Sequence, residues 1–387
     1  MNKIKAGILI ASSIMMSATA LSPILAEVAR AFPTTPVTTV QMIVVLPGLT
    51  SIPFSLLAGR LTTHFTKKHI ALFAMLVMMA GGLIPLLFHA SIAPLLLASG
   101  ILSIGQGLMI PVSASLISDY FEGDERGVLM GWQSTFVNGG GMIMVILSGL
   151  LAKIAWPDAY LLFLLFIPAI TGLAVLLPPG RIMAQPGGSG LGLNRSIAYL
   201  SGTALIFSLL YTTYSTNIAM YLDSTRLGDA TSAGLATSLL TGAGIASGLL
   251  FGRLFRFLKG FTLPLTVGLA TAGLLLTYFG DSLPMVFAGG LVCGFGFSTL
   301  MPLGILLAIQ SVAPERSAFA IAVFTGSVGI GSFISPLLVN GLANLAGHSD
   351  VKTRFLIAAT GLFVLLVITL ARELRARPRL APLPEER

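Results

Sequence analysis

The chain has 387 residues, of which 55% are hydrophobic and only 9% are charged. An ordinary soluble domain has about 25% charged residues, so this composition excludes a water-soluble globular protein. The excess of 22 basic over 14 acidic residues would suggest nucleic-acid binding in a soluble protein, but in a membrane protein it reflects the orientation of the helices. The long apolar segments lack the alternation of β-barrel strands, which predicts an all-α integral membrane protein.

Twelve apolar segments predict twelve transmembrane helices, because each is long enough to cross a bilayer and is bounded by Gly, Pro or charged residues. The first six are expected near residues 6–26, 38–60, 69–88, 92–118, 127–152 and 158–178. The second six are expected near 197–221, 231–254, 261–280, 283–311, 317–346 and 353–372. We therefore expect a helical bundle over 1–178, a cytoplasmic linker over 179–196, a second bundle over 197–372 and a cytoplasmic tail over 373–387.

The start of the chain has a second interpretation. Lys3 and Lys5 precede an apolar run that ends at Ala18-Thr19-Ala20, as in a secretory signal with a small-residue cleavage site. Cleavage there would remove the first span and disturb the charge pattern and the repeat described below. We favour a first transmembrane helix.

The distribution of basic residues predicts the orientation of the helices. If the N-terminus is inside, all but five of the 22 Lys and Arg residues fall on the cytoplasmic side. The exceptions are Arg30, Lys153, Arg226, Lys352 and Arg354. The positive-inside rule then places both termini in the cytoplasm, and we expect the protein in a bacterial cytoplasmic membrane.

The two sets of spans are related by a shift of about 193 residues, which indicates a duplication. Gly59-Arg60-Leu61 recurs as Gly252-Arg253-Leu254, and Glu125-Arg126 recurs as Glu315-Arg316. Both copies begin and end on the same side, so the repeat is parallel and implies a pseudo-two-fold axis along the membrane normal. We expect two six-helix pseudo-symmetric bundles with a path between them.

The loop after the second span carries a family resemblance. The segment from Gly59 to Lys68, Gly-Arg-Leu-Thr-Thr-His-Phe-Thr-Lys-Lys, resembles the motif G-x-L-x-D-x-x-G-[RK]-[RK] of the major facilitator superfamily. Asp-Glu-Arg-Gly at 124–127 is similar to the companion sequence after the fourth helix. Thr63 and Thr66 replace the Asp and the second Gly of the motif. The resemblance implies the fold of that superfamily, secondary transport by alternating access, and a conformational role at the inner loops for Gly59, Lys67, Lys68, Asp119 and Arg126.

Candidate substrate-binding residues are polar or aromatic side chains within spans. No Asp, Glu, Lys or Arg lies clearly in the middle of a span, which favours a neutral or amphipathic substrate held by hydrogen bonds, aromatic rings and apolar walls. Gln106 and Asn138 lie near the middle of the fourth and fifth spans, where an interhelical hydrogen bond is the alternative role. The full candidate set is Gln106, Gln133, Asn138, Tyr211, Tyr214 and Asn217.

Three of these candidates share the seventh span. Tyr211, Tyr214 and Asn217 recur every three residues, which keeps them on one broad face of a helix. They are suited to stack on and hydrogen-bond a ligand, whereas anchoring at the membrane interface is the alternative for Asn217. Gln133, beside Trp132 near the inner end of the fifth span, is a weaker candidate because Trp belongs at the headgroup boundary.

Two charge pairs with a spacing of three mark the outer ends of the first and seventh spans. Glu27 with Arg30, and Asp223 with Arg226, are candidates for an outer gate that breaks when the gate opens. Glu27 or Asp223 is also a candidate carrier of a coupled proton. The alternative is two solvent-exposed ion pairs that contribute about 0 to 1 kcal/mol each.

Metal, cofactor and enzyme chemistry are not expected. Cys293 is the only cysteine, and the four histidines lack ligand-spaced neighbours. No G-x-x-x-x-G-K-[ST] loop is present for ATP, and no mid-span His, Asp, Glu or Lys is available for catalysis. Two features of drug/proton antiporters are also absent, because Ser99 stands at the position of their fourth-helix Arg and Asn138 to Gly141 lack the Pro of their fifth-helix motif.

The leading prediction is a secondary transporter, with a slight preference for export of a small neutral or amphipathic organic compound. The alternative is an uptake carrier, a proton symporter or facilitator, for a polar metabolite such as a sugar or organic acid. A non-transporting membrane scaffold or receptor is the remote alternative. The expected partners are a small-molecule substrate and the lipid bilayer, with a coupled proton left open, no nucleic acid, and a monomeric state by fold-level analogy.

Overall fold

The computed structural model describes residues 3–62, 64–121, 123–178, 194–312, 317–347 and 350–376, and these residues contain no β-strand. The first part of the chain forms α1 (Lys3–Ser12), η1 (Thr19–Ile24), α2 (Leu25–Ala31), α3 (Val37–Leu61), α4 (Lys67–Leu87), α5 (Ile92–Tyr120), α6 (Gly123–Leu151), η2 (Trp156–Leu165) and α7 (Phe166–Leu176). The second part forms α8 (Arg195–Ser224), α9 (Ala230–Leu258), η3 (Lys259–Phe261), α10 (Thr262–Tyr278), α11 (Leu283–Gln310), α12 (Ser317–Leu345) and α13 (Val351–Ala376). The predicted all-α fold class is confirmed.

Ten helical stretches in the described residues are long and apolar enough to cross a membrane. One of them, Ala230–Tyr278, contains α9, η3 and α10, which the sequence predicts as two spans. The first predicted span is not among the ten, because residues 3–31 form short pieces of helix. With these two differences, the twelve predicted spans correspond to the observed helices.

The expectation of one continuous helix over 6–26 is wrong, and the reason is local. The hydroxyls of Ser12, Ser13 and Thr19 donate to backbone carbonyls three or four residues earlier, at 2.7–2.9 Å. Such bonds compete with the helical pattern, and Pro23 lies within η1. Gly140 of α6 packs against the backbone of Ser13, where any β-carbon would overlap the carbonyl oxygen.

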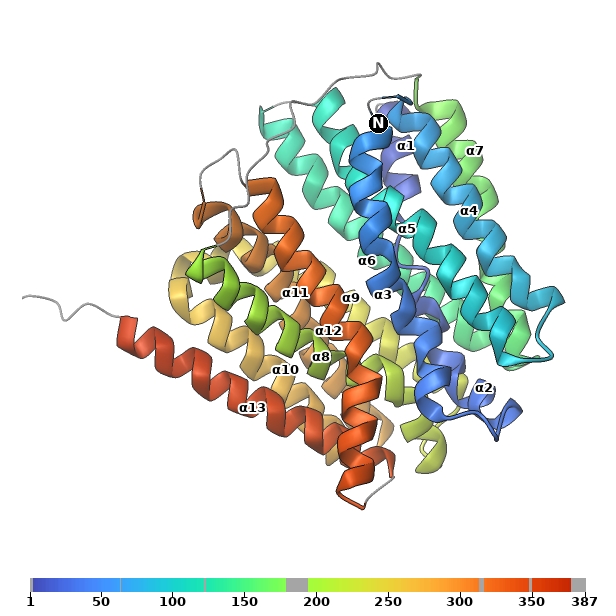
Figure 1. Ribbon diagram of the computed structural model, residues 1–387, viewed down its shortest axis with the longest axis vertical. Coiled ribbons are helices and arrows are strands. Elements are labelled where there is room, and N and C mark those ends of the chain that lie inside the picture. Colours follow the sequence, from blue (N-terminus) through green and yellow to red (C-terminus); the bar gives the residue numbers. More distant parts are fainter. Residues whose placement is uncertain are drawn as a thin grey trace, which may run out of the picture.

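The helices form two groups that repeat the same packing (Figure 1). In the first group α5 packs against α3 and α4, and α1 packs against α7. In the second group α11 packs against α9 and α10, and α8 packs against α13. The groups meet through α3 with α12 and through α6 with α9, which are equivalent pairs in the repeat. We call these groups the N-half (α1 to α7) and the C-half (α8 to α13).

The halves touch along only part of their length. We call the end where α7 ends and α8 begins the linker face, and the opposite end the distal face. A β-carbon at Gly149 of α6 would lie 2.7 Å from the carbonyl oxygen of Ala230, near the distal face. Near the middle, a β-carbon at Gly329 of α12 would lie 2.5 Å from the Gly48 oxygen of α3. Toward the linker face, a β-carbon at Gly131 or Gly252 would meet nothing within 4 Å, so the halves separate there.

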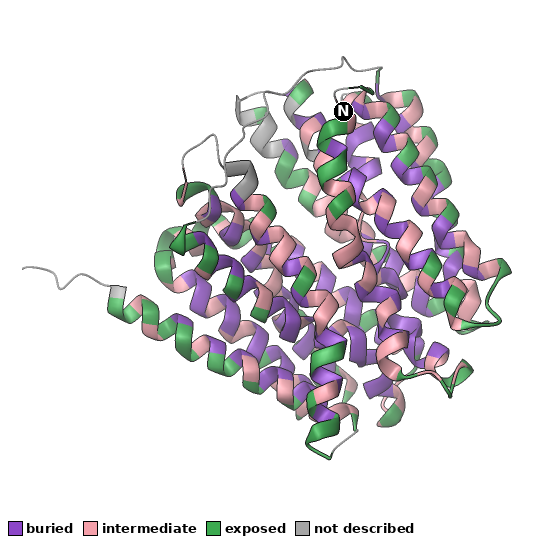
Figure 2. Cartoon of the chain, in the orientation of Figure 1, coloured by how far each residue is buried: buried purple, intermediate pink, exposed green. Residues whose placement is uncertain are grey.

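Apolar side chains also cover the outside of the bundle. Buried residues concentrate where helices face one another, and exposed residues lie along the periphery (Figure 2). Phe73 of α4, Val175 of α7 and Phe363 of α13 are each more than half exposed. In a multi-pass membrane protein such surfaces face lipid hydrocarbon, so the site is to be found between the halves.

Candidate functional site

A cavity of about 910 Å³ lies between the N-half and the C-half. The N-half contributes Met15, Met16, Gln106, Ile110, Gly131, Trp132, Ser134, Thr135, Val137 and Asn138, and the C-half contributes Gly244, Ile245, Gly248, Leu249, Phe251, Phe297, Ser298, Met301, Pro302 and Ile305. None of these described lining residues is Asp, Glu, Lys, Arg or His. The volume is within the range of small-molecule binding sites.

Two carboxamides give the cavity its polar character. Asn138 donates its side-chain amide to the Ser134 carbonyl oxygen of its own helix at 2.8 Å. Its Oδ1 lies against Gly244 of the opposite half, near the Ser298 hydroxyl, because a β-carbon at Gly244 would be 2.5 Å from Asn138 Oδ1 and 3.0 Å from Ser298 Oγ. The Oε1 of Gln106 is buried and has no hydrogen-bond partner among the described residues. A buried polar atom without a partner costs about 1 to 3 kcal/mol, so this cavity offers hydrogen-bond acceptors.

Aromatic rings back one wall of the cavity. Phe297 of α11 stacks on Tyr211 of α8 with ring centroids 4.4 Å apart and planes 7° apart. Phe207 extends the stack, with its centroid 5.9 Å from Tyr211. The wall is therefore a rigid aromatic surface, of which Phe297 is the member that lines the cavity.

The six candidate substrate-binding residues do not gather in one place. Gln106 and Asn138 line the cavity, and Tyr211 lies behind Phe297 in the aromatic stack. The remaining three have other contacts, at positions away from the cavity lining. Gln133 donates to the Ser113 hydroxyl within the N-half at 3.0 Å.

Tyr214 and Asn217 are fully buried elsewhere. The Tyr214 hydroxyl donates to the Val286 carbonyl oxygen at 3.2 Å, and its ring meets Phe355 edge-on, so it belongs to the core of the C-half. The spacing of three keeps these residues on one broad face of α8. Because three residues are less than one helical turn, each successive side chain is rotated around the helix, from the aromatic stack at Tyr211 toward the junction of the halves at Asn217. Asn217 lies at that junction, where it meets Gln41.

Buried polar residues join the halves near the distal face, and Asn217 is the one among them that the sequence predicts as a site residue. Gln41 of α3 donates to Asn217 Oδ1 at 2.8 Å and to the Thr216 carbonyl oxygen at 3.1 Å. It accepts from Asn340 of α12 at 2.7 Å. Arg354 of α13 also donates to Asn217 Oδ1, at 2.9 Å. We call Gln41, Asn217, Asn340 and Arg354 the amide cluster.

The other three members of the amide cluster were not predicted as site residues, for two reasons. Gln41 and Asn340 are single polar residues in long apolar helices, and nothing in their spacing shows that α3 and α12 meet. Arg354 was expected on the outer side, at the very start of the last span, but it is only 7% exposed because it lies in the first turn of α13, beneath the distal face. A polar residue within a membrane span was the available signal.

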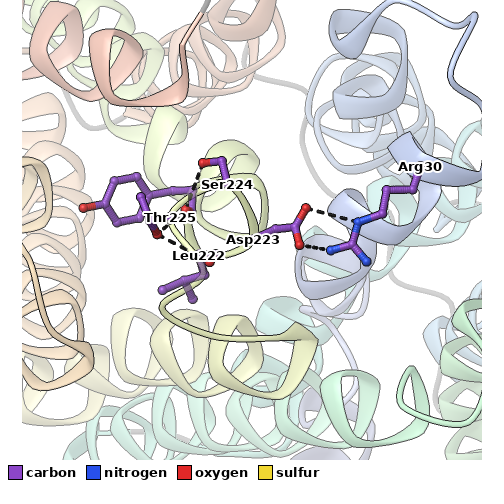
Figure 3. A network of polar contacts seen from close by, with 6 residues as sticks. Arg30, Leu222, Asp223, Ser224 and Thr225 are labelled. Atoms are coloured by element: carbon purple, nitrogen blue, oxygen red, sulfur yellow. Dashed lines mark hydrogen bonds and ion pairs between the residues drawn. The ribbon is translucent and has the colours of Figure 1, made fainter.

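An ion pair between the halves lies at the distal face. Arg30 of α2 contacts both carboxylate oxygens of Asp223 at the end of α8, through Nη2 and through Nε, the latter at 3.1 Å (Figure 3). The expected pairs Glu27 with Arg30 and Asp223 with Arg226 do not form among the described residues. Arg226 follows the end of α8 with a φ of 57°, so the helical spacing of three does not extend to it. The prediction of a gate at these residues stays a prediction, but its pairing differs.

Two further contacts close the same face. The Thr231 hydroxyl of α9 donates to the Gly149 carbonyl oxygen of α6 at 3.2 Å, and Lys153 lies 3.4 Å from Asp229. Partial burial alone would raise the pKa of the Asp229 carboxyl, but hydrogen bonds from Ser232 and Lys153 lower it below its usual range. Asp229 is therefore charged at neutral pH, as this contact requires.

The inner-loop residues implied by the family motif form contacts within the N-half. Lys67, only 7% exposed, pairs with Asp119 at 2.6 Å. Lys68 donates to the carbonyl oxygens of Ala174, at 2.7 Å, and Leu177 at the end of α7. A β-carbon at Gly59 would meet nothing within 4 Å.

One member of that motif set lies outside the described side chains, namely Arg126. Its neighbour Glu125 pairs with Lys5 of α1 at 2.5 Å, a contact that the sequence did not predict. The loops of the N-half are thus tied to one another at the linker face, without a described ion pair to the C-half there.

No group of three or more His, Cys, Asp and Glu residues in the described part of the chain is placed to hold a metal ion. The lone thiol, Cys293, is buried. The site therefore consists of the uncharged cavity and of the closure at the distal face.

Comparison with known proteins identifies the family. The model of the Major Facilitator Superfamily matches residues 7–272 and 191–387. An uncharacterised MFS-type transporter of Pseudomonas aeruginosa is 26% identical over 240 residues, which cover 61% of this chain and 53% of that relative. The match thus spans about half of the relative's length.

Solved structures of similar fold cover nearly the whole chain. A nucleoside transporter superposes with a TM-score of 0.79 at 14% identity, over 95% of this chain and 99% of that chain. A POT family transporter gives 0.74 at 13% identity, over 97% and 98%. A bacterial homologue of the human lysosomal transporter Spinster, in an inward-facing and occupied conformation, gives 0.72 at 15% identity, over 96% of both chains. The likeness to these structures is one of fold, and the family match shows that the chain belongs to the Major Facilitator Superfamily of multi-pass membrane proteins.

Proposed function

We propose that the protein is a secondary transporter that exports a neutral, largely apolar organic compound carrying a hydrogen-bond donor. The observation that carries this proposal is the cavity of about 910 Å³, which is lined by both halves and whose described lining residues are all uncharged. Transport leaves the compound chemically unchanged, and a single chain is the proposed working unit. A coupled proton remains part of the proposal, with Glu27 or Asp223 as its proposed carrier.

The proposed orientation has the linker face in the cytoplasm of a bacterium, with both termini on that side. Lys5, Lys67, Lys68, Arg195 and Lys259 all lie at the ends of helices on this face, as the positive-inside rule requires of a cytoplasmic face. The described conformation then opens to the cytoplasm and is closed to the outside. A cytoplasmic opening to an apolar cavity supports capture of an amphipathic compound from the inside.

The absence of charge from the lining limits the substrate class. An anion or cation transferred into an apolar site without a countercharge loses much of its hydration free energy. A sugar would leave many hydroxyls without partners, because few of the described lining residues have polar side-chain groups, namely Gln106, Trp132, Ser134, Thr135, Asn138 and Ser298. These limits support a neutral compound with few polar groups over the alternative of a polar nutrient.

The two carboxamides further define the substrate. The Asn138 side-chain amide donates one N–H to the Ser134 carbonyl oxygen, which leaves its oxygen and its second N–H for a ligand, and the buried Gln106 Oε1 has no described partner. Both carboxamide oxygens accept hydrogen bonds, and a ligand N–H or O–H is the group that satisfies an acceptor. The flat face of Phe297 next to them suits an aromatic ring.

Alternating access provides the mechanism. Breaking the contacts at the distal face while the linker-face ends of α6 and α9 approach each other would expose the same cavity to the other side. Asn138 and Gly244 belong to different halves and meet at the cavity, so a ligand bound there touches both moving parts. This coupling is how occupancy would bias the switch.

Phenylnaphthylamine, a neutral fluorescent aromatic amine with one N–H donor, tests the substrate class. Thermal unfolding of the purified protein at increasing ligand concentration should give a dissociation constant for this amine about tenfold lower than for its N-methyl derivative. This ratio corresponds to about 1.4 kcal/mol, the contribution of one hydrogen bond. Gln106→Leu or Asn138→Leu should reduce that preference. Gln133→Leu, which changes a glutamine away from the cavity, should leave it intact.

Accumulation of the same amine in cells tests the direction. Cells that produce the protein should accumulate less of it than cells with an empty vector, and Gln106→Leu should remove the difference. Equal binding of the amine and its N-methyl derivative would contradict the donor requirement. Stabilisation by a sugar or an organic acid, with no response to the amine, would instead favour the uptake carrier.

A further inference from the structure

A second hollow of about 280 Å³ lies within the C-half at the linker face, apart from the central cavity. The start of α8, the turn between α9 and α10, the end of α11 and the end of α13 surround it. Lys259 and Arg372 stand at its rim, while Leu200, Leu263 and Leu303 form part of its wall and are at most 5% exposed. The hollow therefore combines a cationic rim with an apolar wall.

The two rim cations have no carboxylate partner among the described residues. None of the described ion pairs includes Lys259 or Arg372. Arg372 lies instead over the ring of Tyr199, with its guanidinium carbon 3.3 Å from the ring centroid. Lys259 directly follows the last residue of α9 and has a φ of 49°, a conformation that costs a non-glycine residue free energy.

At the pseudo-symmetric position in the N-half, the basic residues are paired with groups of the protein itself. There Lys67 is neutralised by Asp119, and Lys68 binds the carbonyl oxygens at the end of α7. Gly7 of α1 also packs closely against Leu176. At the corresponding place in the C-half, the helices leave a hollow, and Lys259 and Arg372 are exposed at its rim. Both halves therefore have basic residues at this position, but among the described residues only those of the N-half form ion pairs or hydrogen bonds through their side chains.

Glu373 is the one acidic residue among the described residues that line the hollow. Its carboxylate packs against Gly260, where a β-carbon would overlap Oε2. It forms no described ion pair with Lys259 or Arg372. Glu373 therefore reduces the positive potential of the hollow without neutralising either cation directly.

We propose that this hollow binds an anionic phospholipid, with the phosphate between Lys259 and Arg372 and part of an acyl chain along the leucine wall. A free phosphate would use the two cations but would leave Phe255 and Leu307, the partly exposed members of the wall, uncovered. A zwitterionic lipid would cover the wall but would bring its own cation toward the rim. The membrane supplies the proposed ligand, because the ends of these helices lie at the boundary between headgroups and water.

Lipid binding to the purified full-length chain in detergent tests the site. We expect dioleoyl phosphatidylglycerol to bind more tightly than dioleoyl phosphatidylcholine, as measured by native mass spectrometry and by the midpoint of thermal unfolding. Lys259→Gln and Arg372→Gln should each weaken phosphatidylglycerol binding about fivefold, since one basic residue contributes affinity of that order for an anionic lipid surface.

Two further variants separate the hollow from general surface charge and from misfolding. Arg375→Gln removes a cation from the same end of α13 but not from the lining, and should leave binding unchanged. Glu373→Gln should tighten phosphatidylglycerol binding, which an unfolded variant cannot do. Equal binding of the two lipids, an equal loss in Arg375→Gln, or full stabilisation by inorganic phosphate alone would each overturn the proposal.

Discussion

The two ends of the interface between the halves differ in their chemistry. At the distal face, the Arg30 to Asp223 ion pair and the buried amide cluster join α2 and α3 to the C-half. At the linker face, the described ion pairs Lys5 to Glu125 and Lys67 to Asp119 both stay within the N-half. The halves are therefore held together from the distal face to the middle of the interface but not at the linker face, and the polar contacts that must break during transport are concentrated at the distal face.

Loss of Gln41 should have the largest effect on this asymmetry. Gln41→Leu would remove hydrogen bonds to Asn217, Asn340 and the Thr216 carbonyl oxygen. Asn217 would keep Arg354 and Asn340 would keep Thr38 as partners, so the cost is that of the three lost hydrogen bonds, about 0.5 to 1.5 kcal/mol each, and the distal face should open. The rate at which a membrane-impermeant maleimide modifies Ser22→Cys, a fully buried position at this face, in a Cys293→Ser background measures this opening.

Gln133→Leu is the matched control for that experiment. Gln133 makes one described side-chain hydrogen bond, to Ser113 within the N-half, so this variant should leave the maleimide reaction at Ser22→Cys slow. If the maleimide reaction is equally fast in both variants, loss of Gln41 affects the folding of the protein rather than the closure of the distal face.

A methyl group in the tight contact between α12 and α3 should have the next largest effect. In Gly329→Ala the new β-carbon would lie 2.5 Å from the Gly48 carbonyl oxygen, whereas in Gly326→Ala on the same helix it would meet nothing within 4 Å. Overpacking costs about 1 to 3 kcal/mol, and here it acts between the halves. Maleimide reaction at Ser22→Cys should rise for Gly329→Ala and not for Gly326→Ala. Equal rates would argue against close packing at this crossing.

The ion pair should have the smallest effect. Arg30 and Asp223 are 58% and 39% exposed, so solvent screening limits their contribution to about 0 to 1 kcal/mol. Asp223→Asn should raise the maleimide rate only slightly, and high salt should have little further effect on that variant. The exchange Arg30→Asp with Asp223→Arg should restore the slow rate. Failure of the exchange would indicate that the geometry of Figure 3 depends on more than opposite charge.

Much of the fold followed from the sequence, because the lengths of the apolar segments and the distribution of charged residues between them determine the helices. The predicted spans from 38–60 onward differ from the observed helix bounds by a few residues. The exception is the first span, where the hydroxyls of Ser12, Ser13 and Thr19 bond to nearby carbonyls. Hydropathy does not detect the competition between these side-chain hydrogen bonds and the helical backbone hydrogen bonds, since these residues do not reduce the apolar character of the segment.

Less of the candidate site followed from the sequence, because the side chains that face one another across the site depend on which helices pack together. Gln106 and Asn138 were identified by the cost of a carboxamide inside a span. The same argument applies to Asn217, but its partners Gln41 and Arg354 come from distant helices and close the distal face. Phe297 was missed since one phenylalanine among 23 carries no signal until its stacking on Tyr211 is seen.

The most direct test of the account is a simultaneous distance measurement at both ends of the interface. Spin labels at Thr34 and Arg226 would report on the distal face, and labels at Gly131 and Gly252 would report on the linker face, each pair in a Cys293→Ser background. We predict that Gln41→Leu lengthens the distal distance and shortens the linker-face distance in the same population of molecules. A longer distal distance with an unchanged linker-face distance would contradict alternating access by these two halves.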